Sequence, residues 1–380
     1  MAAPRVVIVG GGVMGSAVAC FLARDFGLHA TVLERDPSYT RASSALSASS
    51  IRQQFSQAVN IALSRASLGF YRRIGDELGV GDERPHIGLV EPGYLYLAGG
   101  AGAATLRELH AVQRELGVDV ALLDAAALAQ RWPWLNTDHL ALGSWGVSGE
   151  GWYDGWSVLQ AFRRKAIHCG ARFEHAEVQA IEPKRVRCTD GRVFGADAVV
   201  LAAGAWSGKL GIALPVRASK RDVFVFESPA QLPGCPLVID PSGVWFRPEG
   251  RGFICGAPPR ADDDETPLET IDHALFDDLI WPALAARVPA FEALRVTGAW
   301  AGYYEMNSFD HNGLAGELEP GYPGVWLACG FSGHGMQQAP AVGQAIAAQI
   351  AGGTPWVDIG PLSPTRLARN EPLLERNVIG

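Results

Sequence analysis

Short apolar runs separated by glycine turns and helical patterns organise this chain from its first residues. The apolar residues 6–9 lead into Gly10-Gly11-Gly12-Val13-Met14-Gly15, which predicts a buried strand, a G-x-G-x-x-G turn and a helix. Gly10 permits the tight turn, Gly12 lets backbone approach a pyrophosphate, and Gly15 allows close contact between helix and strand. Glu34 follows a second strand at 31–33, where a carboxylate would bind a ribose 2′-hydroxyl. Together these features favour a dinucleotide site over a simple turn.

The same patterns predict the elements that follow. Apolar residues from Gln57 to about Val80 recur at helical spacing and predict one long helix. Residues 216–304 are β-rich and aromatic, with a helix near 267–288. Other segments predict strands at 93–97, 172–174, 178–181, 186–188 and 198–202, and helices at 102–117 and 156–169.

A second junction of strand, glycine turn and helix lies about 320 residues after the first. The apolar residues 325–329 run into Gly330-Phe331-Ser332-Gly333-His334-Gly335 and then a helix that ends near Ile350. Pro340 is tolerable in that helix only close to its start, or with a kink. A third glycine turn, Ala202–Ser207, follows the strand at 197–201. Open α/β sheets bind ligands at the carboxyl ends of their strands, so we expect this turn at the same nucleotide, with a simple turn as the alternative.

These junctions indicate a sheet assembled from both ends of the chain. A contiguous NAD domain would not need the C-terminal part to return, whereas the two ends of FAD need separate cradles. We therefore predict an α/β fold with a discontinuous FAD-binding, Rossmann-like domain of the glutathione-reductase type. The inserted α+β substrate domain contains an antiparallel sheet. The FAD-binding domain is predicted at 1–85, 150–215 and 320–380, and the substrate domain at 86–149 and 216–319.

Small and polar residues at 42–50 form a segment without periodicity, here called the Ser-rich loop. Such a segment is no buried core element. A linker at this point would cut the first domain in half, so we favour a loop packed against a ligand.

Composition narrows the class of protein. A length of 380 residues suits about two domains, and a net charge of −8 argues against nucleic acid as a partner. Six cysteines without CxxC spacing indicate free thiols, with no metal site expected. Only five residues precede the first strand and no apolar run is long enough to span a membrane, so we expect a soluble, cytoplasmic protein. The acidic run 262–265 is expected to be a solvated loop.

Several longer strings resemble the D-amino-acid oxidase superfamily of FAD enzymes, in its sarcosine oxidase and dimethylglycine dehydrogenase branch. The resemblance covers nearly the whole chain. Its strings are Ser50-Ile51-Arg52-Gln53-Gln54-Phe55-Ser56, Gly149-Glu150-Gly151-Trp152-Tyr153-Asp154, Ala202-Ala203-Gly204-Ala205-Trp206-Ser207, Ala299-Trp300-Ala301-Gly302-Tyr303-Tyr304 and the turn from Gly330 on to Pro340.

The resemblance implies which residues hold the cofactor. Those around the ADP half are Gly10, Gly12, Val13, Met14, Gly15, Glu34 and Arg35, with Val178 at the adenine. Those beside the flavin are Ser43, Ser44, Ser49, Ser50 and Ile51, while Ala203, Gly204 and Trp206 close over the cofactor. Those against the isoalloxazine are Gly330, Gly333, His334, Gly335, Met336 and Gln337. A helix N-terminus there would stabilise the negative charge of a reduced flavin.

The resemblance also implies a substrate site. In this branch the arginine that aligns with Arg52 binds the substrate carboxylate, although a structural ion pair is an alternative for Arg52. The implied catalytic residues are Arg52, His334, Gln337, Tyr303 and Tyr304, with Tyr94, Trp245 and Phe246 as further aromatic walls that favour a neutral amine. For His334, simple packing in the turn is the alternative.

Three departures from the family pattern shape the expected reaction. Gly302 replaces the flavin-attaching cysteine and the Ser-rich loop has no histidine, so FAD is expected to be non-covalent. Gln337 replaces a carboxylate-binding lysine, and residues 252–256 lack the lysine that would activate oxygen.

The sequence therefore predicts an oxidoreductase that transfers hydride from a C–N carbon of an amino acid or N-alkylated amino acid to flavin N5. A dehydrogenase with an unidentified electron acceptor is favoured over an oxidase. A likeness to a family member that helps assemble a respiratory complex gives the alternative, an FAD-binding assembly factor. An NAD-dependent dehydrogenase is a third possibility. The oligomeric state stays open.

Overall fold

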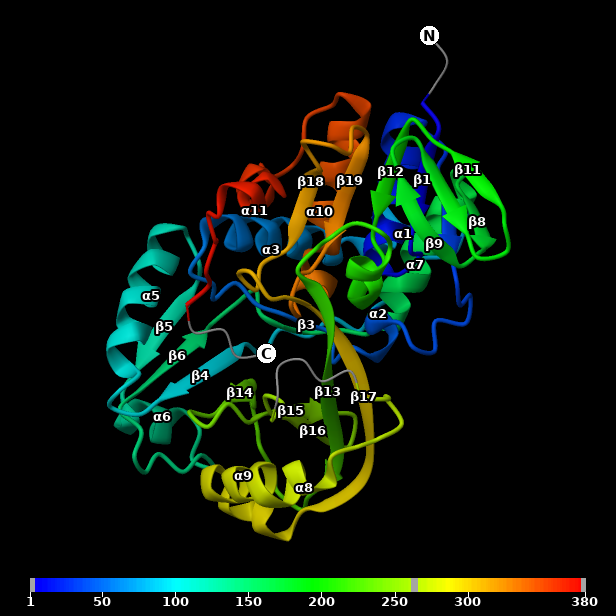
Figure 1. Ribbon diagram of the computed structural model, residues 1–380. Coiled ribbons are helices and arrows are strands. Elements are labelled where there is room, and N and C mark those ends of the chain that lie inside the picture. Colours follow the sequence, from blue (N-terminus) through cyan, green and yellow to red (C-terminus); the bar gives the residue numbers. More distant parts are fainter. Residues whose placement is uncertain (1–3, 261–265, 377–380) are drawn as a thin grey trace.

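The computed structural model describes residues 4–260 and 266–376. A six-stranded sheet lies in the upper part of the molecule in Figure 1. In spatial order the strands are β18 (Leu314–Glu317), β19 (Val325–Cys329), β12 (Ala198–Leu201), β1 (Val6–Val9), β2 (Thr31–Glu34) and β8 (Arg172–His175). All neighbours are parallel except β18, which is antiparallel to β19. This order confirms that both ends of the chain build one sheet, with the carboxyl ends of the parallel strands at one edge.

Long helices cover this sheet. α1 (Val13–Phe26) packs against α7 (Gly155–His168) and α10 (Gly335–Ala351), and α10 also contacts α3 (Ala58–Tyr71). The predicted long helix from Gln57 to Val80 is wrong in its second half. It breaks at the exposed Arg72 and Arg73, where the Arg73 backbone has φ −113° and ψ 15°, and α4 (Ile74–Glu77) follows. Tyr71 and Ile74 are both buried and three residues apart, so the helical spacing of apolar residues continues across the break and does not reveal it.

Pro340 lies inside α10 rather than at its start. A proline cannot donate to the carbonyl four residues earlier, which here is the Met336 carbonyl. The buried Tyr71 hydroxyl donates to that oxygen at 2.7 Å. A side chain from α3 therefore replaces the hydrogen bond that proline removes.

A second, eight-stranded sheet forms the lower part of the molecule in Figure 1. Its strands, in order, are β17 (Arg295–Asn307), β13 (Val216–Glu227), β16 (Gly252–Gly256), β15 (Trp245–Glu249), β14 (Leu237–Ile239), β4 (Tyr94–Ala98), β6 (Leu142–Gly146) and β5 (Val120–Leu123). All pairs are antiparallel except β14 with β4. The expected inserted antiparallel sheet is thus present with one parallel pair, in a mixed α/β fold.

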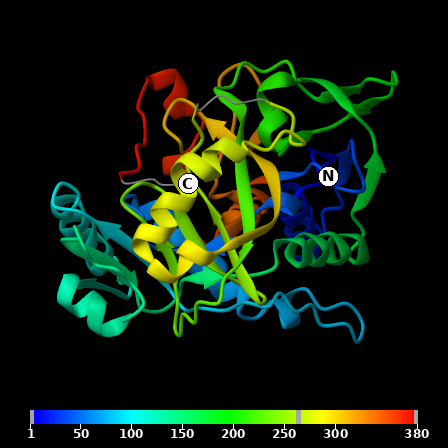
Figure 2. The ribbon, with the colours of Figure 1, turned by 90° about the horizontal axis from the view of Figure 1, so that it is seen from below.

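One face of the eight-stranded sheet carries an aromatic core. Phe224, Phe226 and Phe246 pack there with residues of α9 (Trp281–Arg287) and of α8 (His273–Leu275), which lie over the sheet in yellow in Figure 2. The helix expected near 267–288 therefore begins later than predicted. β18 falls within the segment assigned to the substrate domain, yet it pairs with β19 of the other sheet. The domain boundaries themselves stay a prediction.

Smaller elements complete the described residues. They are α2 (Ser43–Leu46), β3 (Ser50–Ile51) paired with β7 (Gly151–Trp152), α5 (Ala103–Glu115), α6 (Ala125–Arg131), α11 (Thr365–Arg369), and the sheet of β9 (Val178–Glu182), β10 (Arg185–Cys188) and β11 (Val193–Gly195). Within residues 4–260 and 266–376, no helix combines the length and apolarity needed to cross a membrane. The acidic run 262–265 lies outside the described residues.

Candidate active site

The first glycine turn lines a cavity of about 360 Å³, here called the outer cavity. A Cβ atom at Gly15 would lie 1.9 Å from the Gly10 carbonyl oxygen, which explains the glycine at that position. Gly10 has φ +99°, a conformation that favours glycine. At Gly12 an added Cβ would come no closer than 3.4 Å to the Ser44 hydroxyl oxygen, so this position stays open toward the cavity. Helix α1 therefore directs free N–H groups at the cavity, with no acidic residue in its first turn.

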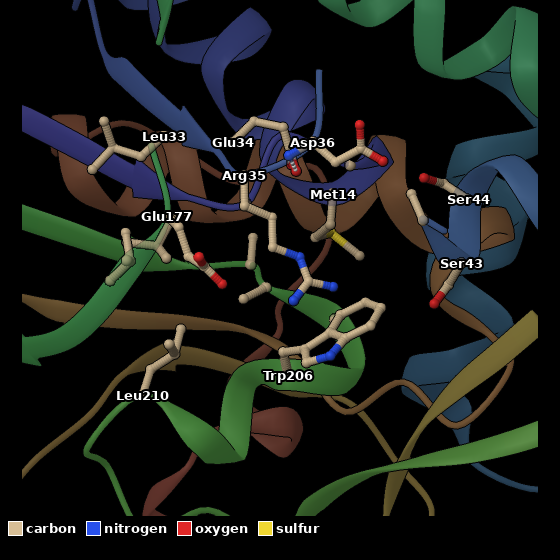
Figure 3. Close-up of a pocket in the computed structure, with 18 of the residues that line it drawn as sticks. Met14, Leu33, Glu34, Arg35, Asp36, Ser43, Ser44, Glu177, Trp206 and Leu210 are labelled. Atoms are coloured by element: carbon tan, nitrogen blue, oxygen red, sulfur yellow. Dashed lines mark hydrogen bonds between the residues drawn. The ribbon is translucent and has the colours of Figure 1, made fainter. Parts of the chain in front are cut away.

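Glu34 reaches the outer cavity from the end of β2 (Figure 3). Its carboxylate accepts hydrogen bonds from the backbone N–H of Gly11 at 2.7 Å and of Asp36 at 2.9 Å. These two bonds hold the carboxylate in one orientation. Each carboxylate oxygen has a second lone pair, so Glu34 can still accept a bond from a ligand hydroxyl.

The opposite wall of the outer cavity comes from the turn after β12. Ala203, Gly204 and Trp206 line it, together with Val178 from β9. The Arg35 guanidinium carbon lies 3.8 Å from the centre of the Trp206 ring, and Figure 3 shows the two side chains facing each other. The sequence therefore predicted these cavity-lining residues, although not the contact between Arg35 and Trp206.

The Ser-rich loop lies between the outer cavity and a second one, here called the inner cavity, and lines both. Its short helix α2 is tied to the eight-stranded sheet, because the Ser43 hydroxyl donates to the Tyr303 carbonyl at 2.6 Å and the Trp300 indole donates to the Leu46 carbonyl at 2.9 Å. Five residues line both cavities, namely Val13, Met14, Ser43, Ser44 and Glu305. The two cavities therefore meet at the loop that the sequence placed against a ligand.

One face of β13, β17 and their neighbours forms the floor of the inner cavity. Arg221 lies opposite Gly302 in the β13–β17 register, and Tyr304 is two residues farther along β17. All three line the cavity, as does Trp245, whose ring covers Gly256 so closely that a Cβ there would lie 2.9 Å from it. The cavity thus combines aromatic walls with two buried residues of opposite charge, Arg221 and Asp222.

Glu305 is the one ionisable residue among the five that line both cavities. Its carboxylate accepts the Gly330 backbone N–H at 2.9 Å. Burial raises the pKa of Glu305 to about 7, while backbone hydrogen bonds from Gly330 and Phe331 oppose that rise. Near neutral pH this side chain can therefore hold or release a proton beside both cavities.

The second glycine turn lies against the inner cavity. Gly333, Gly335 and Met336 line it, and a Cβ at Gly333, which has φ +94°, would lie 2.5 Å from the Tyr304 ring. The N-terminus of α10 therefore lies at the inner cavity, just as the N-terminus of α1 lies at the outer cavity.

Arg52, His334 and Gln337 form a separate buried cluster that lines neither cavity. The Arg52 guanidinium donates to the Tyr96 hydroxyl and lies 3.1 Å from His334 Nε2, while its backbone N–H donates to Gln337 Oε1 at 2.9 Å. Burial lowers the pKa of His334 well below its usual value and the Arg52 charge lowers it further, so the imidazole is neutral. These contacts match the packed histidine that the sequence left as the alternative.

Other expected residues also lie outside both cavities. The cofactor residues concerned are Gly15, Ser49, Ser50, Ile51 and Gly330. The expectation of Phe246 and Tyr94 as walls is wrong. Phe246 follows Trp245 on β15 and so points to the opposite face, into the aromatic core, and Tyr94 stacks on Tyr96 in another core cluster. Tyr303 lines the inner cavity, but its hydroxyl donates to the Thr266 carbonyl.

Sequence reasoning missed Arg221 and Glu305, and each had a signal. Lys220-Arg221-Asp222 is a run of three charged residues within a β-rich segment, and all three are buried. Buried charges of this kind are uncommon away from functional or paired positions. Glu305 directly follows the Tyr303-Tyr304 pair that the sequence did single out.

The outer cavity and its junction with the inner one fit FAD. A glycine turn, a helix N-terminus and an acid at the end of the second strand are the donor set for a dinucleotide. The open position at Gly12 leaves room where a side chain would fill the cavity. A second helix N-terminus at the inner cavity provides the separate cradle that a flavin ring needs.

Comparison with known proteins agrees with this geometry. The FAD-dependent oxidoreductase (DAO) family model matches residues 5–349. The chain is 41% identical to FAD-dependent oxidoreductase domain-containing protein 1 of Xenopus laevis, over 98% of this chain and 84% of that protein.

Two solved structures are similar at 25% sequence identity. L-proline dehydrogenase from P. horikoshii has a TM-score of 0.84 and covers 97% of this chain and 99% of its own. Glycine oxidase from Geobacillus kaustophilus has a TM-score of 0.82, with 96% and 99% covered. The chain therefore belongs to the DAO family of FAD-dependent oxidoreductases.

Proposed function

We propose that the protein oxidises a C–N bond of an amino acid or N-alkylated amino acid, and that it works as a dehydrogenase. The observation that carries the proposal is the inner cavity, which meets the cofactor cavity at Val13, Met14, Ser43, Ser44 and Glu305. When bound non-covalently, FAD would supply the hydride acceptor. Similarity to an L-proline dehydrogenase and to a glycine oxidase supports an amine-bearing substrate.

The chain's own residues would prepare the reaction. Gly12 and the N-terminus of α1 would bind the phosphates, and Glu34 a ribose hydroxyl. Trp245 and Tyr304 would exclude water from the inner cavity and thereby favour the neutral form of the substrate amine. The N-terminus of α10 would stabilise negative charge that develops there.

Two observations support a dehydrogenase rather than an oxidase. Strand β16, at residues 252–256, has no lysine, and Gly256 lies beneath the Trp245 ring. The electron acceptor would then be a carrier other than oxygen.

A cytoplasmic location is a further part of the proposal. The six cysteines are free thiols, which is typical of proteins in a reducing compartment.

Anaerobic reduction of the purified holoprotein tests the proposal. Amino acids and N-methyl amino acids are added in turn and the visible absorbance of the flavin is followed, with dithionite as the control for full reduction. We expect at least one of these compounds to bleach the flavin, and air to restore the colour more slowly than an artificial dye. An FAD that dithionite bleaches but none of these amines reduces would contradict the proposal and favour the assembly factor.

A further inference from the structure

Glu305 lies where the two cavities meet and is the one ionisable residue among the five that line both. It follows Tyr304 on β17, and Ala218 lies opposite it on β13. The residue is half-buried, so part of its surface is open to the contents of the cavities. A cofactor that extends from the outer cavity into the inner one therefore lies against Glu305.

Backbone groups hold the Glu305 carboxylate in place. Its Oε2 accepts the Gly330 N–H at 2.9 Å, and the Phe331 backbone also donates to the carboxylate. In the part of the chain that the structure describes, no lysine, arginine or histidine forms an ion pair with this carboxylate. When it is ionised, Glu305 is thus an anion with a fixed position and no paired cation among the described residues.

The same carboxylate lies at the start of α10. Glu305 Oε1 is 3.0 Å from the point that a Cβ atom would occupy at Gly335, the first residue of that helix. A helix N-terminus stabilises negative charge, and the ionised Glu305 already places one charge there. A reduced flavin beside the same helix end would add a second. Two like charges in one site disfavour each other, and a proton on the carboxylate removes the conflict.

We propose that the Glu305 carboxylate takes up one proton whenever the bound flavin is reduced. Hydride carries two electrons and one proton to FAD, and a second proton forms an O–H bond on Glu305. With the amine of the proposed function, this second proton comes from the N–H bond that breaks, and the electron pair of that bond stays on nitrogen to form the C=N bond. The substrate carbon is oxidised, the flavin is reduced, and the net charge of the site is unchanged.

The acidity of Glu305 suits this role near neutral pH. Burial raises the pKa of Glu305 to about 7, against the effect of the backbone bonds from Gly330 and Phe331. The carboxylate is therefore largely ionised above about pH 7 until a nearby negative charge raises its pKa further. Other charged or titratable residues near it on the surrounding elements are Lys209, Lys220, Arg221, Asp222, Tyr303, Tyr304, Cys329 and His334. Because several of these groups also titrate, the test compares substitutions of Glu305 itself.

The midpoint potential of the bound flavin, measured between about pH 5 and about pH 9, tests the proposal. The holoprotein is reduced anaerobically with dithionite in the presence of a dye of known potential. Above about pH 7 the potential of the unaltered protein should fall more steeply with pH than that of Glu305→Gln. One extra proton changes the equilibrium constant for reduction tenfold more per pH unit, which is about 30 mV for two electrons. Glu305→Asp should keep the extra slope.

Glu150→Gln is the matched control for this measurement. Burial raises the pKa of Glu150 to about 7 as well, but Glu150 lines neither cavity. This variant should therefore keep the steep slope of the unaltered protein. Equal slopes in the unaltered protein and Glu305→Gln would overturn the proposal, and so would a loss of the extra slope in Glu150→Gln alone.

A second measurement covers the case in which Glu305→Gln does not retain FAD. The infrared difference between the oxidised and reduced unaltered holoprotein should then show a protonated carboxyl band that appears on reduction at about pH 8. The band should shift in Glu305→Asp and stay unchanged in Glu150→Gln. Absence of the band, or a band that only Glu150→Gln alters, would contradict the proposal. Neither measurement contains an amine, so failure of this proposal and failure of the proposed function are separate results.

Discussion

The outer and inner cavities meet at the Ser-rich loop, but their walls come from two different sheets and present different chemical groups. The outer cavity places glycine backbone at the ends of β1 and β12 beside side chains such as Glu34 and Trp206, and its strands are parallel neighbours in one sheet. The inner cavity uses side chains on one face of a different sheet, with Arg221, Trp245 and Tyr304 as its main groups. Backbone N–H groups suit the phosphates common to all dinucleotides, whereas side chains can select one substrate. We therefore expect changes in the outer cavity to affect cofactor binding and changes in the inner cavity to affect substrate choice.

The largest effect is expected from Gly15→Ala. The added Cβ would lie 1.9 Å from the Gly10 carbonyl oxygen, a backbone atom, so strand β1 and helix α1 must move apart. The protein should lose its FAD, and its unfolding free energy should fall by about 1–3 kcal/mol, the usual cost of overpacking a buried position. Flavin absorbance after purification and thermal denaturation of the apoprotein measure the two effects.

Gly12→Ala is the matched control for this change. Its Cβ would meet only the Ser44 hydroxyl oxygen, at the ordinary contact distance of 3.4 Å. The apoprotein should keep its thermal midpoint while FAD affinity falls, because the methyl group points into the cavity. A Gly12→Ala protein that loses stability as much as Gly15→Ala would show that the turn is needed for folding and not specifically for the cofactor.

The next effect is a pH dependence that Glu305 contributes where the cavities meet. Burial raises the pKa of Glu305 from 4.5 to about 7 in the folded protein, so the folded state binds more protons than the unfolded state between these values. The contribution of Glu305 to stability is present below about pH 4.5 and is lost as the pH rises through about 7, by about 3 kcal/mol at most. Glu305→Gln should therefore gain stability relative to the unaltered apoprotein between about pH 5 and about pH 8.

Glu150 sharpens this prediction because burial also raises its pKa to about 7, yet it lines neither cavity. Its carboxylate instead accepts bonds from the backbone N–H of Gln53 at 2.6 Å and of Gln54 at 3.0 Å. Urea denaturation with and without FAD separates the two acids. Bound FAD should change the part of the pH dependence of stability that Glu305 contributes, which is the part that Glu305→Gln removes. It should leave the part that Glu150 contributes unchanged. Equal effects of FAD on both parts would contradict a position of Glu305 beside the cofactor.

The contrast between the cavities also explains what the sequence could predict. The turn from Gly10 to Gly15 and the acid Glu34 lie within one βαβ unit, so local spacing was enough to recognise them. The inner cavity depends on which residues of β13 and β17 face each other, and on which face each strand presents. Adjacent aromatic residues such as Trp245 and Phe246 point to opposite faces, so a prediction that ignored alternation took both as walls.

The pattern of strand, glycine turn and helix found the second glycine turn, and roles for its neighbours then came from the family resemblance. The resemblance assigned Arg52 to the substrate, whereas Tyr96 and His334 surround that guanidinium in the fold. These residues come from distant parts of the chain, and no local pattern links them. The position of Arg221 opposite a glycine likewise depends on strand register, which the sequence alone did not supply.

A smaller effect is expected from Tyr71→Phe, which tests how firmly α10 holds its end of the inner cavity. The change removes the hydroxyl that donates to the Met336 carbonyl and leaves that buried oxygen without the bond that Pro340 cannot make. The unfolding free energy should fall by about 1–3 kcal/mol, the usual cost of an unsatisfied buried group. Tyr153→Phe is the control, because the Tyr153 ring lies only 4.7 Å from Tyr71 but its hydroxyl has no hydrogen bond to a carbonyl of α10. Equal losses in the two variants, measured by urea denaturation, would argue against this role for the Tyr71 hydroxyl.

The smallest effect is expected at the exposed edge of the outer cavity, from Arg35→Ala. The Arg35 guanidinium lies 3.8 Å from the Trp206 ring centre, and exposed contacts of this kind contribute about 0.5–1 kcal/mol. FAD affinity should therefore fall only about 2- to 5-fold, measured by titrating the apoprotein with FAD and following flavin fluorescence. Arg35→Lys and Trp206→Leu both keep a positive charge beside the cavity. A contact between ring and cation predicts a loss in Trp206→Leu and little change in Arg35→Lys, whereas a simple charge effect predicts no loss in either variant. A loss in Arg35→Ala as large as that in Gly12→Ala would mean that a side chain, and not only backbone, holds the cofactor in the outer cavity, and the contrast between the two cavities would weaken.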